Sequence, residues 1–246
     1  MQIIFLGTNG WYSALNNTVC TLIDSEKFYI ILDAGDGLFR LSNFIKTEKP
    51  ILMFLTHTHL DHIIGLHILN KFRFKQGINI YGYEGTKKSL DAIIRHPFTS
   101  PFSDVPFKVE IHDFEEGIHK NPLPFISKKL LHSDDCVGYR FEIENKIILF
   151  CTDTGVCDNI YLLSQNADLL ISECSYKQGQ EKWGWPHLKP EEIALIAKET
   201  GVKQLILTHF DASIFQTMED RKRALKKAKQ IFEPTIIAYD EFKFSL

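Results

Sequence analysis

Short apolar runs separated by polar segments dominate the hydropathy pattern of this chain. Residues 51–55 (Ile-Leu-Met-Phe-Leu) form one such run, which predicts a buried strand, and the apolar residues 63–69 predict a short helix. The polar segment between them, residues 56–62 (Thr-His-Thr-His-Leu-Asp-His), therefore lies on a strand-to-helix turn. Turns at the carboxyl ends of strands are where open α/β sheets expose chemistry.

Other apolar runs end in the same way, with a histidine or an acidic residue. Strands are predicted to end near residues 32, 131, 152 and 208. They are followed by Asp33, His132, Asp153 and His209. One such residue after a strand is usually a loop or capping residue, but the ordered set predicts a common site. Gly35 and Gly37 permit the close turns that a crowded site needs.

The segment 56–62 concentrates four good metal ligands, which are His57, His59, Asp61 and His62. Imidazole and carboxylate together suit a borderline divalent ion such as zinc, or manganese or iron where oxygen ligands dominate. His57 and His59 face the same way on an extended segment, while Asp61 and His62 diverge from them at the helix start. This layout can serve two adjacent metals. A polar loop that is merely rich in histidine explains this density poorly.

The ordered set resembles the motifs of the metallo-β-lactamase superfamily along essentially the whole chain. The resemblance implies a four-layered αβ/βα sandwich with its site at one edge between two sheets. Three segments are similar to the ribonuclease Z and phosphodiesterase branch: Phe5-Leu6-Gly7-Thr8, Gly138-Tyr139-Arg140 and Thr152-Asp153-Thr154.

The resemblance also assigns roles to the candidate ligands by motif. It implies that His57, His59 and His132 bind a first metal, and that Asp61, His62 and His209 bind a second. Asp153 would bridge the two metals. Asp33 would orient ligands instead of binding metal, as carboxylates near metal-bound imidazoles commonly do.

Glu173 and His187 are similar to the glutamate and histidine motifs of the same branch. Glu173 ends a predicted strand over residues 167–172, and His187 follows a Gly-Trp-Pro loop and precedes a helix that opens at Pro190. The resemblance implies that His187 protonates the leaving oxygen or binds the scissile phosphate, with Glu173 keeping it charged. Asp61, Glu173 and His187 are thus the predicted catalytic residues. Alternatively, Glu173 pairs only with backbone and His187 only caps the helix.

Composition is typical of one compact enzyme domain over residues 1–246. With 246 residues, 44% of them hydrophobic, the chain can bury a large core. No apolar run approaches membrane-spanning length and the N-terminal residues lack the features of a signal peptide, which predicts a cytoplasmic protein. Residues 95–106 predict a loop near the mouth of the site. The scattered cysteines predict reduced thiols: Cys20, Cys136, Cys151, Cys157 and Cys174.

Charge and chain length bear on the substrate. With a formal net charge of −3, the chain lacks the basic character of a dedicated nucleic-acid binder. Basic residues from Arg221 to Lys229 are predicted to form a solvated helix face instead of an RNA-binding patch. In the family that the chain resembles, members that process tRNA usually carry a long arm between the residues matching His132 and Asp153. In this chain only twenty residues separate them, and a predicted hairpin around Asn145 accounts for these residues. No arm is left, so RNA is not favoured as a substrate.

These observations predict a phosphodiesterase with two divalent metal ions that hydrolyses a small or cyclic phosphodiester. Zinc is the expected metal, with manganese and iron as alternatives. The alternative functions are a tRNA 3′-end endonuclease, a thioester or lactone hydrolase, and a non-catalytic binding protein. The full set of ligand types argues against the last. No membrane partner is expected, and a homodimer is compatible with the resemblance, because dimers are common in the family.

Overall fold

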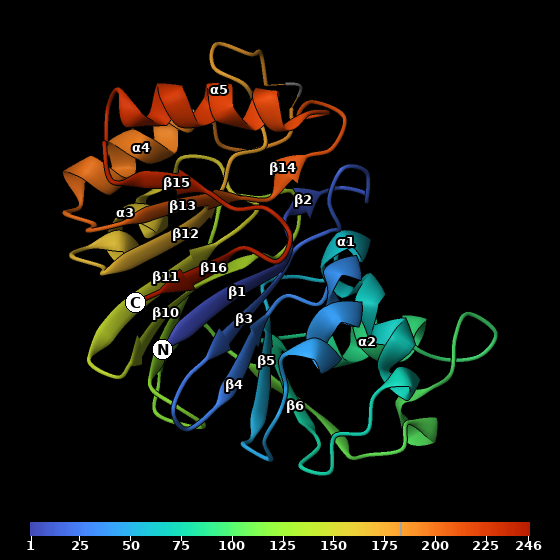
Figure 1. Cartoon of the computed structure of the whole chain (residues 1–246). Helices are drawn as coiled ribbons and strands as arrows, with labels where there is room; N and C mark the ends of the chain where they lie inside the picture. The colour runs from blue at the N-terminus through green and yellow to red at the C-terminus, as the bar shows by residue number, and fades with distance from the viewer. Residues whose placement is uncertain (183) are drawn as a thin grey trace. The chain divides into compact units, whose positions relative to one another are not determined.

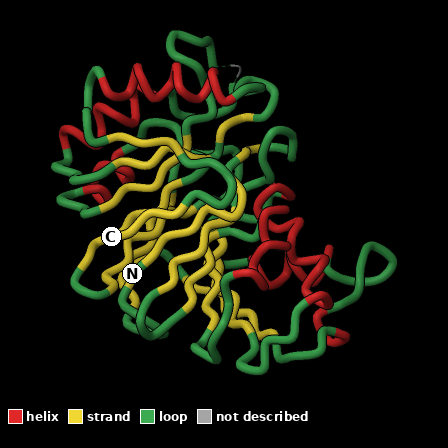
Figure 2. Tube along the Cα trace, in the orientation of Figure 1, coloured by secondary structure: helices red, strands yellow, loops and turns green. Residues whose placement is uncertain are grey.

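Two compact units, each built on a seven-stranded sheet, make up the computed structural model, which describes residues 1–182 and 184–246. The first unit contains residues 1–7, 17–115 and 240–246, and the second contains residues 8–16 and 116–239. Figure 1 labels most of the helices and strands of both units, and Figure 2 distinguishes helices from strands by colour.

The sheet of the first unit has the strand order β16-β1-β3-β4-β5-β6-β7. From β4 to β7 neighbouring strands are parallel, whereas β1, β3, β4 and β16 pair antiparallel. The central strands β4 and β5 contain only apolar residues, as expected of parallel strands that are buried on both faces. The bounds are β1 (Gln2–Gly7), β3 (Cys20–Asp24), β4 (Tyr29–Leu32), β5 (Ile51–Leu55), β6 (Ile78–Tyr83), β7 (Val109–Phe114) and β16 (Lys243–Ser245).

Short helical segments cover one face of this sheet. Leu38, Leu66 and Leu90, one from each of three segments, share a buried core with Ile31 and Met53 of the strands. The segments are η1 (Asp36–Asn43), α1 (Leu60–Ile63), η2 (Ile64–Lys71), α2 (Thr86–Ile93) and η3 (Phe102–Asp104). The helix predicted for residues 63–69 is thus a 3-10 helix that follows a single α-helical turn.

Two glycines allow η1, α1 and η2 to pack closely. A Cβ atom on Gly35 would lie 2.4 Å from the backbone oxygen of Asp61, and one on Gly65 would lie 2.3 Å from the backbone oxygen of Gly35. Both distances are too short for any side chain. The close turn predicted at Gly35 is therefore present, and it depends on the missing Cβ atom.

The sheet of the second unit has the order β15-β13-β12-β11-β10-β9-β8. The strands β11, β12, β13 and β15 run parallel, and β8, β9, β10 and β11 form an antiparallel meander. A two-residue pair, β2 (Asn9–Gly10) with β14 (Phe210–Asp211), completes this unit. The other bounds are β8 (Gly117–His119), β9 (Phe125–Lys129), β10 (Val137–Ile143), β11 (Lys146–Cys151), β12 (Leu169–Glu173), β13 (Leu205–Thr208) and β15 (Thr235–Ile237).

Three helices cover one face of the second sheet, as Figures 1 and 2 show. They are α3 (Asp158–Ser164), α4 (Pro190–Glu199) and α5 (Met218–Lys229). Leu163, Ile193 and Ala224 of these helices share a buried core with Leu170 and Leu205 of the strands. The predicted helix that opens at Pro190 is present, and Pro190 occupies its first turn, where the missing N–H costs nothing.

The predicted hairpin around Asn145 is also present. The strands β10 and β11 pair as far as Ile143 and Lys146, which leaves Glu144 and Asn145 as a two-residue turn. Both turn residues have positive φ, 53° and 59°. This is the conformation of a type I′ turn, which matches the twist of the strands it joins.

Two predictions about local structure were wrong. The strand before His132 ends at Lys129, and the backbone N–H of Leu130 instead bonds to the carbonyl of Cys136 across a loop. Arg221, predicted to lie on a solvated helix face, is completely buried, although Lys222, Arg223 and Lys226 on the same helix are exposed.

The cysteines are free, and Cys157 is less buried than the other four. Burial raises the pKa of Cys20, Cys151 and Cys174, which keeps these thiols protonated. Within residues 1–182 and 184–246, none of the helices combines the length and the apolar character that crossing a membrane requires.

Candidate metal-binding and catalytic residues

The parallel strands of the second unit bring several predicted site residues to one edge of its sheet. Cys151 pairs with Ser172 across β11 and β12, and Glu173 pairs with Thr208 across β12 and β13. Because parallel neighbours end at the same edge, the residues at and just beyond their carboxyl ends lie together. These residues are Asp153, Glu173 and His209.

Side-chain distances confirm that this group is compact. Nε2 of His209 lies 3.1 Å from Oδ2 of Asp153. His132, Asp153 and His187 each offer one ligand atom, and these atoms lie within 4.8 Å of one another. His132 reaches the group from the loop after β9, although it does not end a strand as predicted.

Glu173 and His187 are in direct contact. Nδ1 of His187 lies 2.9 Å from Oε1 and 3.1 Å from Oε2 of Glu173. The buried carboxylate also accepts hydrogen bonds from the backbone N–H groups of Thr154, at 2.6 Å, and Leu188, at 3.3 Å. Glu173 therefore joins the segment after β11 to the segment that carries His187.

The charge state of His187 follows from these neighbours. Burial opposes protonation of the ring, but the carboxylates of Glu173, Asp153 and Asp211 outweigh it and raise the pKa of His187 to about 9. The ring is therefore a cation at neutral pH. Since Nδ1 bonds to Glu173, Nε2 is the nitrogen that can donate a proton to another molecule.

In the first unit, Asp33 follows β4 and the histidine segment follows the parallel neighbour β5. Asp33 is completely buried and accepts hydrogen bonds from the backbone N–H of Thr56, at 2.8 Å, and from its hydroxyl, at 2.9 Å. Nδ1 of His62 lies 2.8 Å from Oδ2 of Asp33. The carboxylate thus fixes both ends of the predicted ligand segment.

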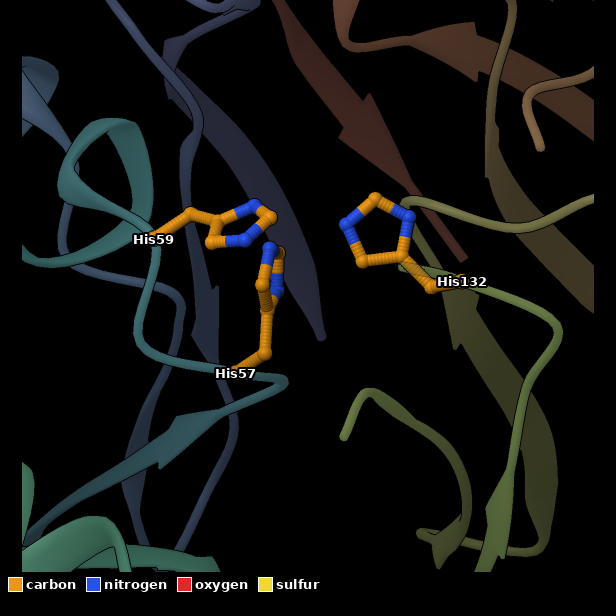
Figure 3. A group of neighbouring side chains, drawn as sticks. All are labelled: His57, His59 and His132. Carbon is orange, nitrogen blue, oxygen red and sulfur yellow. The ribbon is translucent and has the colours of Figure 1, made fainter. Parts of the chain in front are cut away.

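The four predicted ligands of the first unit gather beside Asp33. The ring centroids of His57 and His59 lie 4.4 Å apart, and those of His57 and His62 lie 4.1 Å apart. Oδ2 of Asp61 lies 3.5 Å from Nε2 of His62. Figure 3 shows the rings of His57 and His59 close together on the segment after β5, and it also shows His132 on its own loop.

Hydrogen bonds at Nδ1 set the tautomer of several histidines. Nδ1 of His57 lies 3.1 Å from the hydroxyl of Thr56, and Nδ1 of His209 lies 3.2 Å from the hydroxyl of Ser175. Each hydroxyl donates its own proton elsewhere, to Asp33 and to the carbonyl of His209, so each must accept from the ring. With Nδ1 protonated there, Nε2 carries the lone pair that binds a metal. This donor set of imidazoles and carboxylates fits divalent metal ions.

Three predicted site residues have a left-handed backbone, which is uncommon for residues other than glycine. The φ angles are 58° at Asp33, 49° at Asp153 and 48° at His209. Such conformations cost about 1 to 3 kcal/mol each and collect at functional sites. Each of the three follows a strand directly or within two residues, so the turn in the backbone redirects the side chain at the edge of the sheet.

Besides Ser175, sequence reasoning missed two further residues that support His209. A Cβ atom on Gly10 would lie 2.4 Å from Cε1 of the His209 ring. The guanidinium of Arg221 bonds to the side chains of Thr8, at 2.9 Å, and Asn9, and lies 4.4 Å over the ring of Phe210. Only structure reveals these contacts, because residues 8–10 and 221 are distant in sequence.

A comparison with protein families identifies the class of protein. Residues 29–210 match the model of the beta-lactamase superfamily domain, so the chain belongs to the beta-lactamase superfamily. Ribonuclease Z of Bacillus velezensis is 25% identical over 304 aligned residues, which cover 98% of this chain and 97% of the relative. The probable metallo-hydrolase YhfI of Bacillus subtilis is 26% identical over 220 residues, 85% of this chain and 86% of the relative.

Solved structures agree with the predicted fold. The metallo-β-lactamase fold protein YhfI from Bacillus subtilis superposes with a TM-score of 0.81 at 24% identity, covering 99% of this chain and 98% of that one. The short form of human tRNase Z superposes with a TM-score of 0.78 at 22% identity, covering 100% and 99%. The chain therefore has the metallo-β-lactamase fold and is a metal-dependent hydrolase of the ribonuclease Z-like branch.

Proposed function

We propose that the chain is a dinuclear metal-dependent phosphodiesterase that hydrolyses a small or cyclic phosphodiester. The observation that carries this proposal is the contact between buried Glu173 and His187 beside Asp153. Phosphodiester cleavage expels an alkoxide that needs a proton, whereas a thioester expels a thiolate that does not. A charged imidazole held by a carboxylate therefore favours phosphodiester chemistry.

The family pattern and the donor chemistry of each unit support an assignment of the metal ligands. We infer that His57, His59 and His132 would hold one ion, that Asp61, His62 and His209 would hold the other, and that Asp153 would be a ligand of both. Zinc suits the imidazole-rich set, and manganese and iron are alternatives. Bound divalent ions would lower the pKa of water and neutralise charge on the phosphoryl oxygens.

The residues around the metals have their own roles in the proposed reaction. His187 donates the proton on Nε2 to the leaving oxygen, and Glu173 keeps the ring oriented and charged. Asp61 and Asp153 compensate the positive charge of the metal ions. Asp33 orients His62 through its Nδ1 contact and His57 through the hydroxyl of Thr56.

The lengths of the alignments favour a small substrate. The alignment with ribonuclease Z of Bacillus velezensis spans 304 residues although this chain has 246, so several tens of its positions have no counterpart here. The alignment with YhfI has few such positions, since its 220 positions cover 85% of the 246 residues of this chain, or about 209 residues. The chain thus aligns with nearly the whole of its ribonuclease Z relative but lacks several tens of that relative's residues.

A tRNA 3′-end endonuclease is the second candidate function. It is supported by curated relatives named ribonuclease Z that align with nearly the whole of this chain. A single domain over residues 1–246, a cytoplasmic location and a homodimer stay predictions from the sequence.

Replacing His187 by alanine tests the proposed chemistry. Hydrolysis of diesters with poor leaving groups, such as nucleosides, should slow by roughly 10² to 10⁴ in kcat, which is the usual contribution of a general acid. Hydrolysis of a nitrophenyl diester should slow much less, because nitrophenolate leaves without a proton. The measurement is kcat for both substrates, together with the metal content, which should not change.

Two further variants make this test specific. Glu173→Gln should reproduce the pattern more weakly, because it lowers the pKa of His187. His67→Ala removes an exposed histidine of η2 and should change neither rate. Equal losses on both substrates in His187→Ala would make this residue a phosphate-binding or structural group and would contradict its role as an acid.

Replacing Asp153 by alanine tests the metal assignment. Elemental analysis of the wild-type chain should find two divalent ions per chain, and Asp153→Ala should retain less metal and lose activity, since it removes a ligand and negative charge together. Asp158→Ala, at an exposed position on α3, is the matched control. Full metal content and activity in Asp153→Ala would rule out the bridging role.

A further inference from the structure

Three exposed apolar side chains lie next to site residues of the second unit. They are Leu131, Val156 and Trp185, with exposed fractions of 50%, 43% and 53%. Leu131 directly precedes His132, Val156 lies three residues after Asp153, and Trp185 lies two residues before His187. Single exposed apolar residues are common on protein surfaces, but here each of three separate loops supplies one beside a site residue.

Contacts between these loops place the three segments that carry these residues next to one another. The backbone N–H of Gly155 donates to the carbonyl of Leu131 at 2.8 Å. A Cβ atom on Gly155 would lie 3.0 Å from Cδ2 of Leu131 and 3.2 Å from Cβ of Pro186. Because Gly155 has no side chain, the loop of Leu131 and the loop of Trp185 can both pack against it.

The loop of Trp185 is also tied to the candidate site. Its carbonyl accepts hydrogen bonds from the backbone N–H of His187, at 3.0 Å, and from the hydroxyl of Tyr176, at 3.3 Å. Tyr176 is buried, and its ring centroid lies 6.0 Å from that of His187. These contacts hold the backbone of Trp185 near the residue that we assign as the proton donor.

We propose that Leu131, Val156 and Trp185 form an apolar rim that binds an aromatic ring carried on the leaving-oxygen side of the substrate. This inference rests on the proposed function, because His187 defines where the leaving oxygen lies. An indole face and two branched aliphatic chains can cover a flat aryl or heterocyclic ring, whereas the indole N–H is the only group of the three side chains that can hydrogen-bond to a polar alcohol. The substrate class is therefore a phosphodiester with an aromatic or heterocyclic leaving-side substituent.

Two diesters that differ only in the size of the ring test the rim. Phenyl methylphosphate and 2-naphthyl methylphosphate release phenols of similar acidity, so the chemical step is nearly matched. The metal-loaded full chain should prefer the naphthyl ester in kcat/KM by roughly three- to tenfold, as partial burial of one more ring provides. Leu131→Ser and Trp185→Ser should bring this preference close to one.

The control is Leu162→Ser on α3, where the leucine is 56% exposed but is not adjacent in sequence to a site residue. It should keep the wild-type preference. If both esters are hydrolysed but the preference is absent, or survives in Leu131→Ser and Trp185→Ser, the rim is overturned while the proposed function stands.

A binding measurement separates the rim from turnover. In calorimetric titrations of the metal-loaded chain, 2-naphthyl phosphate should bind roughly three- to tenfold more tightly than phenyl phosphate, and Trp185→Ser should remove this difference. Hydrolysis of no diester with zinc, manganese or iron would contradict the proposed function. In that case, tighter binding of 2-naphthyl phosphate in the titration would still support the rim. Equal binding of the two phosphates would overturn it.

Discussion

Asp33 illustrates how a buried carboxylate can orient imidazoles at a proposed metal site. Its carboxylate holds Nδ1 of His62 at 2.8 Å and reaches His57 through the hydroxyl of Thr56. Both rings are thereby fixed in the tautomer that presents Nε2. Ser175 holds His209 in a similar way in the second unit. Hydroxyl groups thus serve in both units to orient imidazoles.

Asp33→Asn should weaken metal binding without removing a ligand. An amide of the same size provides a poorer acceptor for the ring of His62, so metal affinity should fall by about 10- to 100-fold. Competition with a chromophoric chelator measures this affinity. Asp91→Asn, at an exposed position of α2, should leave it unchanged. Unchanged affinity in Asp33→Asn would limit Asp33 to a structural role.

At this scale the sequence predicted ligand candidates better than their supports. The histidine-rich segment and the residues after strands are visible as motifs, because metals require particular side chains in a particular order. The contacts of Ser175, Gly10 and Arg221 carry no such signal. Arg221 even belongs to a run of basic residues in which its neighbours are exposed, and only tertiary contacts distinguish it.

Among the elements, α5 has a structural role that its basic composition conceals. Its Arg221 is completely buried and donates to the side chains of Thr8 and Asn9 and to the carbonyl of Ala238. These bonds fix the short pair of β2 with β14, which adjoins His209. The helix therefore stabilises the backbone that positions one of the proposed ligands.

Arg221→Met should lower the free energy of unfolding by about 3 kcal/mol, because it leaves several buried acceptors without their donor. Arg223→Met on the same helix should cost about 0.5 kcal/mol or less, because Arg223 is largely exposed. Urea denaturation of both variants provides the comparison. Equal stabilities would show that the buried guanidinium contributes no more than a surface charge.

Strands were easier to predict than helical segments in this chain. Apolar runs such as β4, β5 and β12 need only a buried sheet to explain them. The short 3-10 helices η1 and η2 depend on the close approach of Gly35 and Gly65, which no local pattern specifies. The strand before His132 was extended too far, since Leu130 and Leu131 are apolar but lie in a loop.

At the scale of the whole molecule, the shorter length of this chain relative to ribonuclease Z of Bacillus velezensis leads to a prediction about RNA. The metal-loaded chain should cleave precursor tRNA at its 3′ end with a kcat/KM at least about tenfold below that for a small aromatic diester. Both rates should be measured at the same salt concentration, since electrostatic RNA binding depends on salt. More efficient and site-specific cleavage of precursor tRNA would instead support the endonuclease candidate.

The assignment of chain segments to the two units could not be read from the sequence. Residues 8–16 belong with the second unit and residues 240–246 with the first. Strand β16 pairs with β1 near the start of the chain, and β2 pairs with β14 about two hundred residues later. Hydropathy patterns are local, so they predict strands but do not reveal which distant strands become neighbours.

The turn of the β10–β11 hairpin is a site at which the fold can accept an inserted segment. Its turn consists only of Glu144 and Asn145, both exposed, and Ile143 and Lys146 on either side are paired with each other. A segment spliced between the two turn residues would leave and re-enter the fold at adjacent positions, so neither strand would need to shift. An RNA-binding arm inserted at this turn would therefore change the substrate, while the proposed catalytic residues keep their positions.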